Sequence, residues 1–598
     1  MNSLPSELLD SIALTIPSSE ALKLFLSAFP QALFTPVLSA LHELVYSNVD
    51  VQWPMVTVSN PTAWPLKCIE QLVFFQPKIS LAYPITSAKD FVHAHSMNKF
   101  ITNITVAPAG NAKLTLSIGS KLCSELKTCS LESVQIDVSQ TRQFTEWLYP
   151  LFGLLDIPSL QEYSLVYPVQ VHRAISSVAP REFGRKLLNW LLAGKSTKLE
   201  LCNVSWYTDS QLVCALIDAL QKCTSLETLC LENVSFFEDH VFYGSNLPAS
   251  VHTFRWYRRR SSGLPWATTT QCLALALVHA TQLKSLDLSG NEGLDPDILA
   301  QVIPTLLQLK SLNLNGVQLS QTLIEAFARL PHLQSLDLGG RDFNGLSTTL
   351  ARVLPSCVKL QHLSLVNRVP TANDDLHTLV SVLPRIPSLQ SIAWTSKVLR
   401  RPGILLLESI LPQCPKLRSL TLTGELCSAH AYGAPVFNSF SSLRLEDLVL
   451  NKYELDDKGA CELAKVLPQC AHLRSIDISN NLYTGKGLSA IVESLPSTVQ
   501  AVNLASQGYY LDGLKATAVA LSKKSWKTLD VSVNYEPNLV SFLELLSTTT
   551  TKKLDVKIPW NILSPGCYHE CANVIQKLNS RVGPIECKII IHFNAKTK

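Results

Sequence analysis

The chain has 598 residues, of which 46% are hydrophobic and 16% charged, and its 51 basic and 47 acidic side chains give a formal net charge of +4. This length exceeds one ordinary core, and the near-neutral balance provides no global attraction to nucleic acid or anionic membranes. The N-terminus lacks a basic segment followed by an apolar core, and no run of 18 apolar residues occurs. We therefore expect a protein of the cytoplasm or nucleus, with neither a membrane nor a nucleic acid as partner.

Residues 1–50 predict a small helical unit. Apolar residues recur at helical spacing up to Ile16, a polar break follows at Pro17, and a second apolar stretch begins near Leu22. The opening phrase LPSELLDSI (4–12) resembles an F-box. That resemblance implies contact with the small adaptor of a cullin–RING (SCF-type) ubiquitin ligase through Leu4, Pro5, Leu8, Leu9, Ile12 and Ile16.

The same thirty residues fit a second interpretation. F-boxes usually continue with a phrase that contains Val, Cys, Lys and Trp, whereas this chain continues with LSAFPQALFTP (26–36). The segment can equally be an N-terminal cap that packs inward against the rest of the chain.

Residues 51–200 contain weak strand phrases, ITNITV (101–106), LESVQID (131–137) and LQEYSLV (160–166), whose starts lie 30 and 29 residues apart. Their spacing predicts irregular early copies of the repeat described below.

The run FRWYRRRSSGLPW (254–266) has the most unusual local composition in the chain. Arg255, Trp256, Tyr257 and Arg258 combine guanidinium groups with aromatic rings. Such a run is typical of protein-binding hot spots, and it can also bind phosphate or stack on bases. The simplest interpretation is a solvated loop within a long repeat, with protein contact as the first alternative and nucleic acid as the second.

Residues 201–553 repeat one phrase. It appears as LETLCLEN (226–233) and LKSLDLSGN (283–291), and it returns after Leu283 at 309, 333, 360, 389, 417, 445, 473, 499 and 526. Alternate leucines predict a short strand with one buried face, and the second half of each copy, such as GACELAKVLPQC (459–470), has helical periodicity. The phrase resembles the ribonuclease-inhibitor-like class of leucine-rich repeats. It implies an α/β solenoid with parallel strands inside a curve, helices outside and a partner on the concave strand face.

Two columns of small polar residues are expected on that face. The first contains Ser285, Ser311, Ser335, Ser419 and Ser475, and the second contains Asp287, Asn313, Asp337, Thr421 and Asp477. They are candidates for partner binding. The repeat consensus carries similar residues, so the columns can also serve only to keep the strands soluble.

Cys357, Cys414 and Cys470 each close an LPxC phrase, in which Ile386 takes the cysteine position of the intervening copy. A position that accepts Cys or Ile is apolar and buried, so we predict reduced, unbridged thiols. The end of the chain, 554–598, is the predicted cap of the array, with a terminal strand at 587–593.

The sequence favours a protein that binds other proteins, and it predicts no catalytic residue, metal or cofactor. Together the two resemblances imply a substrate receptor of a ubiquitin ligase. A repeat scaffold without a ligase link is the main alternative, and a GTPase-activating protein of the leucine-rich-repeat kind is the third.

Overall fold

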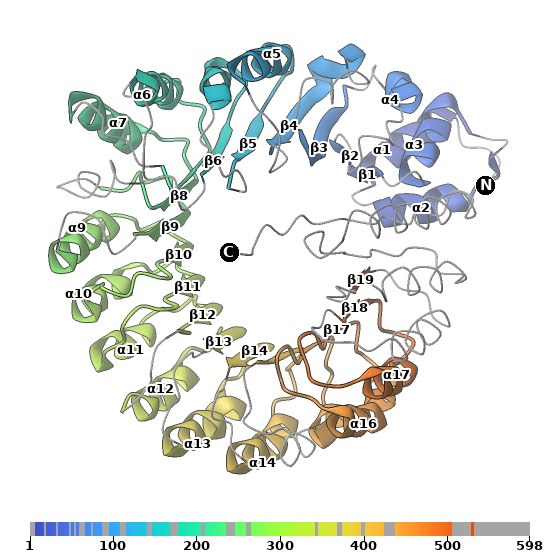
Figure 1. Cartoon of the computed structure of the whole chain (residues 1–598), viewed down its shortest axis with the longest axis vertical. Helices are drawn as coiled ribbons and strands as arrows, with labels where there is room; N and C mark the ends of the chain where they lie inside the picture. Colours follow the sequence, from blue (N-terminus) through green and yellow to red (C-terminus); the bar gives the residue numbers. More distant parts are fainter. Residues whose placement is uncertain are drawn as a thin grey trace. The chain divides into compact units, whose positions relative to one another are not determined.

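The computed structural model describes residues 6–16, 19–31, 34–46, 49–52, 55–58, 66–72, 76–85, 95–107, 115–139, 146–167, 178–204, 210–234, 246–258, 265–340, 345–366, 373–395, 401–423, 437–504 and 528–530. The chain divides into two compact units, whose helices and strands are labelled in Figure 1. Unit 1 comprises residues 1–264 and 275–280, and unit 2 comprises residues 265–274 and 281–598.

Unit 1 begins with three helices and continues as a sheet whose strands β2 to β9 are parallel neighbours, with β1 antiparallel to β2. Its strands are β1 (Val49–Gln52), β2 (Met55–Val58), β3 (Lys78–Ile85), β4 (Ile101–Val106), β5 (Ser133–Asp137), β6 (Glu162–Val166), β7 (Lys198–Cys202), β8 (Thr228–Glu232) and β9 (Thr253–Tyr257). Its helices are α1 (Ser6–Thr15), α2 (Ser19–Ser27), α3 (Pro36–Tyr46), α4 (Leu66–Leu72), η5 (His95–Phe100), α5 (Leu116–Leu126), η6 (Glu146–Asp156), α6 (Val178–Leu192) and α7 (Ser210–Lys222). The helix α9 (Trp266–Val278) has residues in both units.

Unit 2 is a parallel sheet in which each strand from β10 to β19 pairs with the next. The strands are β10 (Ser285–Asp287), β11 (Ser311–Asn313), β12 (Ser335–Asp337), β13 (His362–Val366), β14 (Ser391–Thr395), β15 (Ser419–Thr423), β16 (Asp447–Val449), β17 (Ser475–Asp477), β18 (Ala501–Asn503) and β19 (Thr528–Asp530). The helices are α10 (Pro296–Val302), α11 (Gln321–Phe327), α12 (Ser347–Val353), α13 (Asn373–Val382), α14 (Arg401–Ile410), α16 (Asp457–Val466) and α17 (Gly485–Ser494). The short 3-10 helices are η7 (Ile303–Thr305), η8 (Leu354–Ser356), η9 (Leu383–Arg385), η10 (Leu411–Gln413), η12 (Ser439–Ser442) and η13 (Leu467–Gln469).

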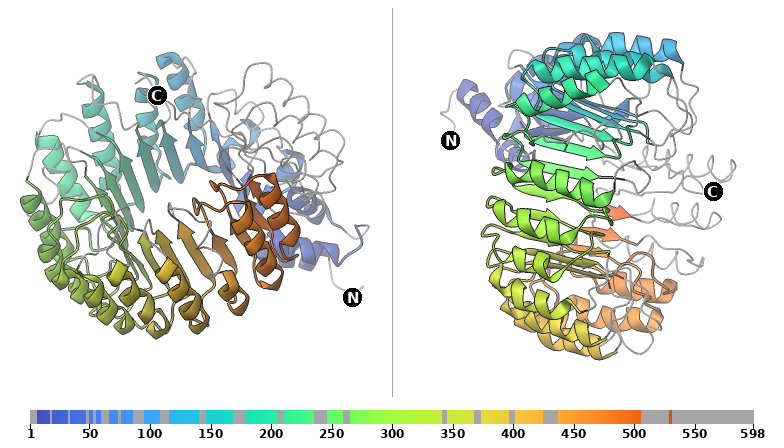
Figure 2. Two further views of the ribbon diagram at one scale, coloured as in Figure 1. Left: turned by 60° about the horizontal axis from the view of Figure 1, so that its bottom comes forward. Right: turned by 90° about the vertical axis from the view of Figure 1, so that its left-hand side faces the viewer.

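Within unit 2 the strands line the inner side of an arc and the helices its outer side (Figure 2). The leucines of the repeated phrase explain this layering. Leu286, Leu312 and Leu336 are paired across neighbouring strands and at most 1% exposed, whereas the residues on either side of each are half-exposed. One face of the sheet therefore belongs to the core, and the opposite face, which we call the strand face, contacts solvent. The predicted strand–helix repeat is confirmed.

The weak phrases upstream are also strands of this kind. β4 matches the predicted 101–106, and β5 and β6 lie within the other two phrases. Isoleucine and valine take the leucine positions of β4 and β5, and the fully buried Tyr163 takes one in β6. Between the helices η6 and α6, the Phe152 and Phe183 rings lie 4.8 Å apart in the core. These replacements explain why the leucine pattern fades although the fold continues.

Buried asparagines turn the chain after several strands. The Asn481 side chain is 3% exposed, donates to the carbonyls of Leu450 and Ile478 at 2.8 Å, and accepts from the Leu455 amide at 3.1 Å. It therefore joins its own repeat to the preceding one. In unit 1, the Asn233 side chain donates to the Asn203 side chain at 2.8 Å, which joins two other neighbouring repeats.

An aspartate of one repeat accepts hydrogen bonds from the start of the helix in the next repeat, and we call this contact a cap between repeats. One oxygen of Asp457, in α16, accepts from the Thr484 amide at 2.8 Å and from the Gly487 amide at 2.9 Å, both at the start of α17. A Cβ on Gly487 would lie 2.6 Å from that oxygen, so glycine permits the close approach. Asp297 of α10 likewise accepts from the hydroxyl of Thr322 in α11.

The C-terminal predictions meet the structure only in part. The phrase at 526–532 contains β19, which pairs in parallel with β18. The predicted cap at 554–598 lies outside the described residues.

The three LPxC thiols are expected to resist labelling. Cys357, Cys414 and Cys470 are free, at most 5% exposed, and burial raises the pKa of each to about 11. At pH 8 only about one thiol in a thousand is then a thiolate. Brief treatment of the native protein with a polar thiol reagent, followed by peptide mass spectrometry, should modify the exposed Cys214 first. Equally rapid modification of the three buried thiols would contradict this packing.

Replacing Asn481 with alanine should lower the free energy of unfolding by about 1–3 kcal/mol, because buried backbone groups lose their partners. Urea unfolding measures the loss. Asn438→Ala is the matched control, because its side chain is exposed and makes one 3.3 Å bond to Glu408. Equal losses in the two variants would show that the hydrogen bonds of Asn481 contribute nothing to the free energy of unfolding.

Candidate functional site

The two predicted polar columns lie on the strand face of unit 2, in register. Neighbouring strands align Ser285 with Ser311 and Ser335, and Asp287 with Asn313 and Asp337. The remaining candidates, Ser419, Thr421, Ser475 and Asp477, occupy the same positions of β15 and β17. All ten side chains are half-exposed. The structure thus brings these residues together on one surface, as the spacing predicted.

The second column has a structural role that the sequence interpretation missed. Oδ1 of Asp287, of Asn313 and of Asp337 accepts the backbone amide two residues ahead, in each case at 3.0 Å. Asp477 does the same at 2.9 Å, and its second oxygen accepts from Asn503 at 2.8 Å. These side chains form Asx turns that end the strands. In the sequence, these turns could have been predicted from the recurring pattern of Asp or Asn followed two residues later by Ser, Asn or Gly.

The registers also add residues to the columns. His362 and Asp447 stand in the serine column, and Ala393 and Val449 stand in the aspartate column. Burial raises the pKa of Asp447, the neighbouring Glu446 carboxylate raises it further, and Arg474 opposes both. The columns are therefore less uniform than the leucine phrases suggested.

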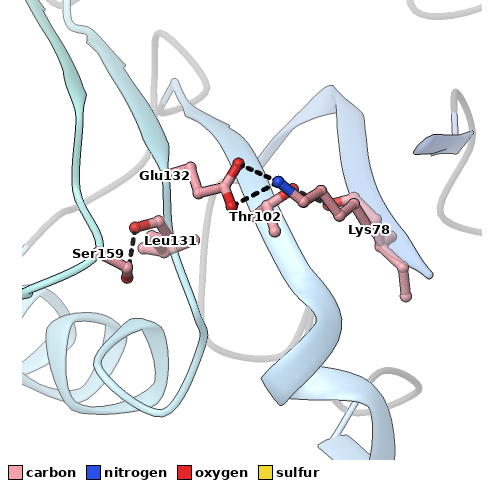
Figure 3. Close-up of polar contacts among 6 residues, drawn as sticks. Lys78, Thr102, Leu131, Glu132 and Ser159 are labelled. Carbon is pink, nitrogen blue, oxygen red and sulfur yellow. Dashed lines mark hydrogen bonds and ion pairs between the residues drawn. The ribbon is translucent and has the colours of Figure 1, made fainter. Parts of the chain in front are cut away.

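The strand face of unit 1 carries ion pairs as well as Ser133, whose hydroxyl donates to Glu162 at 2.9 Å. Lys78 of β3 donates to both oxygens of Glu132, at 2.7 and 2.9 Å, and so passes over β4 next to Thr102 (Figure 3). Lys198 lies 3.4 Å from Glu200 on the same strand. Since these side chains are partly exposed, the pairs orient one another but add little to stability.

The Arg–aromatic run is not a loop where the structure describes it. Thr253–Tyr257 is β9, with Phe254 and Trp256 at most 2% exposed in the core. Arg258 is also buried, at 2% exposed. The alternation of a strand accounts for this correction, because the aromatic rings occupy the positions that leucine fills elsewhere.

Two of the four predicted hot-spot residues therefore remain on the surface. Arg255 is exposed and lies 3.6 Å from Glu232 of β8, and Tyr257 is half-exposed on the same face. Residues 259–264 lie outside the described part of the chain.

Two thiols stand in register with these charged residues, because Cys230 pairs with Glu200 and Arg255 and Cys202 pairs with Glu232. Cys202 and Cys230 are free and at most 8% exposed. Burial, with a smaller contribution from the Glu200 carboxylate, raises the pKa of Cys230 to about 11 against the opposing charge of Arg255. Among the described residues, no three His, Cys, Asp or Glu side chains are grouped to hold a metal ion. The described helices also include none with the length and apolar character of a membrane span.

The N-terminal residues divide into buried and exposed groups. Leu9 is 8% exposed, so we remove it from the candidate adaptor contact, because its surface already packs inside the unit. Ile12 is 37% exposed, Ile16 is half-buried, and Leu24 of α2 is 74% exposed. Leu4 and Pro5 lie outside the described residues, and Leu8 belongs to α1.

The third helix, α3, was not predicted, although its buried Leu38, Leu41, Leu44 and Val45 follow helical spacing. It packs against α4 and β1, and so attaches the N-terminal helices to the first strands of unit 1.

Substitutions in β9 test the corrected position of the Arg–aromatic run. Trp256→Ala should lower the free energy of unfolding by about 3–5 kcal/mol, because it empties a core site. Arg255→Ala should cost at most about 1 kcal/mol, because its ion pair is exposed. Thermal unfolding of both variants measures the difference. A tryptophan variant as stable as the wild type would restore the loop interpretation.

No family model and no curated protein sequence matches this chain. Solved structures do resemble it. LegL7, a leucine-rich repeat-containing protein from Legionella pneumophila, aligns with 51% of this chain and 93% of its own length, at 20% identity and a TM-score of 0.32. The structure of the Rad7 and Elc1 complex in yeast aligns with 65% of this chain and 78% of the matched chain, at 15% identity and a TM-score of 0.36. The repeat geometry itself, with its buried leucines, in-register parallel strands and outer helices, identifies the described chain as a leucine-rich-repeat solenoid.

Proposed function

We propose that this chain is a non-catalytic receptor that binds a protein on its strand face and attaches through its N-terminal helices to the adaptor of a cullin–RING ubiquitin ligase. The observation that carries the first part is the continuous, half-exposed polar surface formed in register by Ser285, Ser311 and Ser335 and their successors.

The dimensions of the strand face favour a macromolecular partner. Neighbouring strands lie ~4.8 Å apart, so the nine strands β10 to β18 span roughly 40 Å. A surface of this length accommodates an extended segment of about twelve residues or one side of a folded domain. Because the rows are built on strands, their side chains are held in a fixed arrangement before a partner binds, which lowers the entropic cost of binding.

The exposed apolar side chains of α1 and α2 support the second part. Ile12 and Leu24 remain accessible, whereas Leu9, Leu22 and Leu26 lie on the buried faces of the same helices. Each helix therefore keeps one apolar side chain accessible outside the core that holds the unit together. These side chains fit the resemblance of the opening phrase to an F-box, with Ile12 as the anchor that remains available.

The adaptor contact is tested by a pull-down with purified ligase adaptor. Ile12→Asp/Leu24→Asp should retain the melting temperature and lose the adaptor, because both side chains are exposed and a buried carboxylate is costly at an apolar contact. Leu116→Asp, at a 48% exposed position of α5, is the matched control and should retain binding. A wild-type protein that fails to bind the adaptor would remove the ligase role and leave the scaffold alternative.

The strand-face contact is tested independently. Ser311→Trp/Ser335→Trp places bulk on the face, and Ser381→Trp/Ser409→Trp places the same bulk on exposed helical positions of α13 and α14. Quantitative mass spectrometry of proteins captured from cells should show partners that the wild type and the helix control retain and the strand-face variant loses. Identical capture by all three proteins would argue against a partner on this face.

A further inference from the structure

Two rows at the start of strands β10 to β14 differ from the rest of the sheet. The first row consists of the residue that precedes each strand, and the second row of the residue that begins it. The first contains Lys284, Lys310, Gln334, Gln361 and Gln390, and the second contains Ser285, Ser311, Ser335, His362 and Ser391. We call these the strand-start rows.

Backbone hydrogen bonds align the rows from one repeat to the next. The Lys284 carbonyl accepts the amides of Lys310 and Ser311, at 2.7 and 3.0 Å. The Lys310 carbonyl accepts those of Gln334 and Ser335, at 2.8 and 2.9 Å, and the same pattern continues to β14. The rows are therefore a fixed consequence of strand pairing.

The strand-start rows are rich in hydrogen-bond donors. Lysine, glutamine and serine can all donate, and no carboxylate stands in either row from β10 to β14. Lys284 and Lys310 are exposed on adjacent strands, and neither ammonium group forms an ion pair with a carboxylate of the described residues. Two like charges are thus held next to each other without neutralisation.

The acidic residues of the same face are separated from these lysines and already engaged. Asp287 and Asp337 lie at the other end of their strands, roughly 10 Å from the residue that precedes each strand. Each accepts a backbone amide at 3.0 Å in its Asx turn. Near the strand starts of β10 to β14, a partner therefore meets ammonium, amide and hydroxyl groups and no carboxylate.

Other cations on the described strand faces have acidic partners. Arg418 pairs with Glu446, and Arg474 lies 4.0 Å from the same carboxylate. In unit 1, Lys78, Lys198 and Arg255 each pair with a glutamate. This contrast places the unneutralised positive charge at β10 and β11.

We propose that the strand-start rows of β10 to β12 bind an acidic protein segment, in which Asp or Glu side chains meet Lys284 and Lys310 and backbone carbonyls accept from the serine hydroxyls. This inference rests on the proposed strand-face function and specifies the chemistry of its partner. Opposite charge directs the approach, and the hydroxyl donors fix the position of the segment.

The test uses the full chain and a fluorescein-labelled peptide of alternating glutamate and serine, about twelve residues long. Fluorescence anisotropy at low salt should show saturable binding that weakens as salt is added. Lys284→Glu/Lys310→Glu should weaken binding at least about tenfold, because two attractive contacts become repulsive. Lys121→Glu/Lys458→Glu, at exposed positions of α5 and α16, is the charge-matched control and should bind as the wild type does.

Three outcomes would overturn the inference: the charge-reversed variant binds the glutamate peptide as tightly as the control does, a lysine–serine peptide binds better than the glutamate peptide, or single-stranded RNA competes more strongly than the peptide. The cellular capture experiment separates this inference from the proposed function. If Ser311→Trp/Ser335→Trp loses partners that Lys284→Glu/Lys310→Glu retains, the strand face binds protein and the acidic assignment is wrong.

Discussion

The structure depends on the hydrogen bonding of parallel strands that are too short to be stable alone. The carbonyl of Lys284 accepts two backbone amides of the next repeat. The carbonyl of Lys310 in that repeat accepts two amides of the repeat that follows. One repeat cannot satisfy its backbone or cover its leucines without a neighbour, so stability comes from stacking. The same bonds fix the register, and the register determines which side chains stand beside one another on the strand face. The backbone hydrogen bonds that stack the repeats therefore also determine which side chains are neighbours on the strand face.

This rule explains how well the fold could be predicted. A leucine in every copy of the phrase must meet the leucines before and after it, so a nearly constant spacing from Leu283 onward was enough to predict parallel strands and outer helices. The rule says nothing about residues that occur once. The helix α3 has an ordinary helical pattern but no counterpart elsewhere in the chain, and it was missed. In unit 1 the same stacking uses isoleucine, valine and Tyr163 at leucine positions, which weakened the signal without altering the strands.

The candidate surface was less predictable because its properties depend on which groups each side chain contacts in the folded chain. The positions of Ser311 and Asp337 followed from alternation, whereas the use of Asp337 in an Asx turn required knowledge of the backbone. A solvated loop in a long repeat was the simplest interpretation of the run that contains Trp256, although the alternation Phe254–Arg255–Trp256 already matched a strand. The isolation of Lys284 could not be seen in the sequence, where Asp287 stands only three positions away. Charge content alone therefore gives a poor account of what a repeat surface offers to a partner.

The caps between repeats give the array a direction. Asp457 lies in the earlier repeat and accepts backbone amides at the start of the helix of the later one, whereas Asp297 accepts the Thr322 hydroxyl of α11. Removal of repeats from the C-terminal side of such a cap leaves the remaining helices with their acceptors. Removal from the N-terminal side exposes amides at the first turn of the new terminal helix. Truncated fragments of equal length should therefore differ in how readily their ends fray, according to which end was cut.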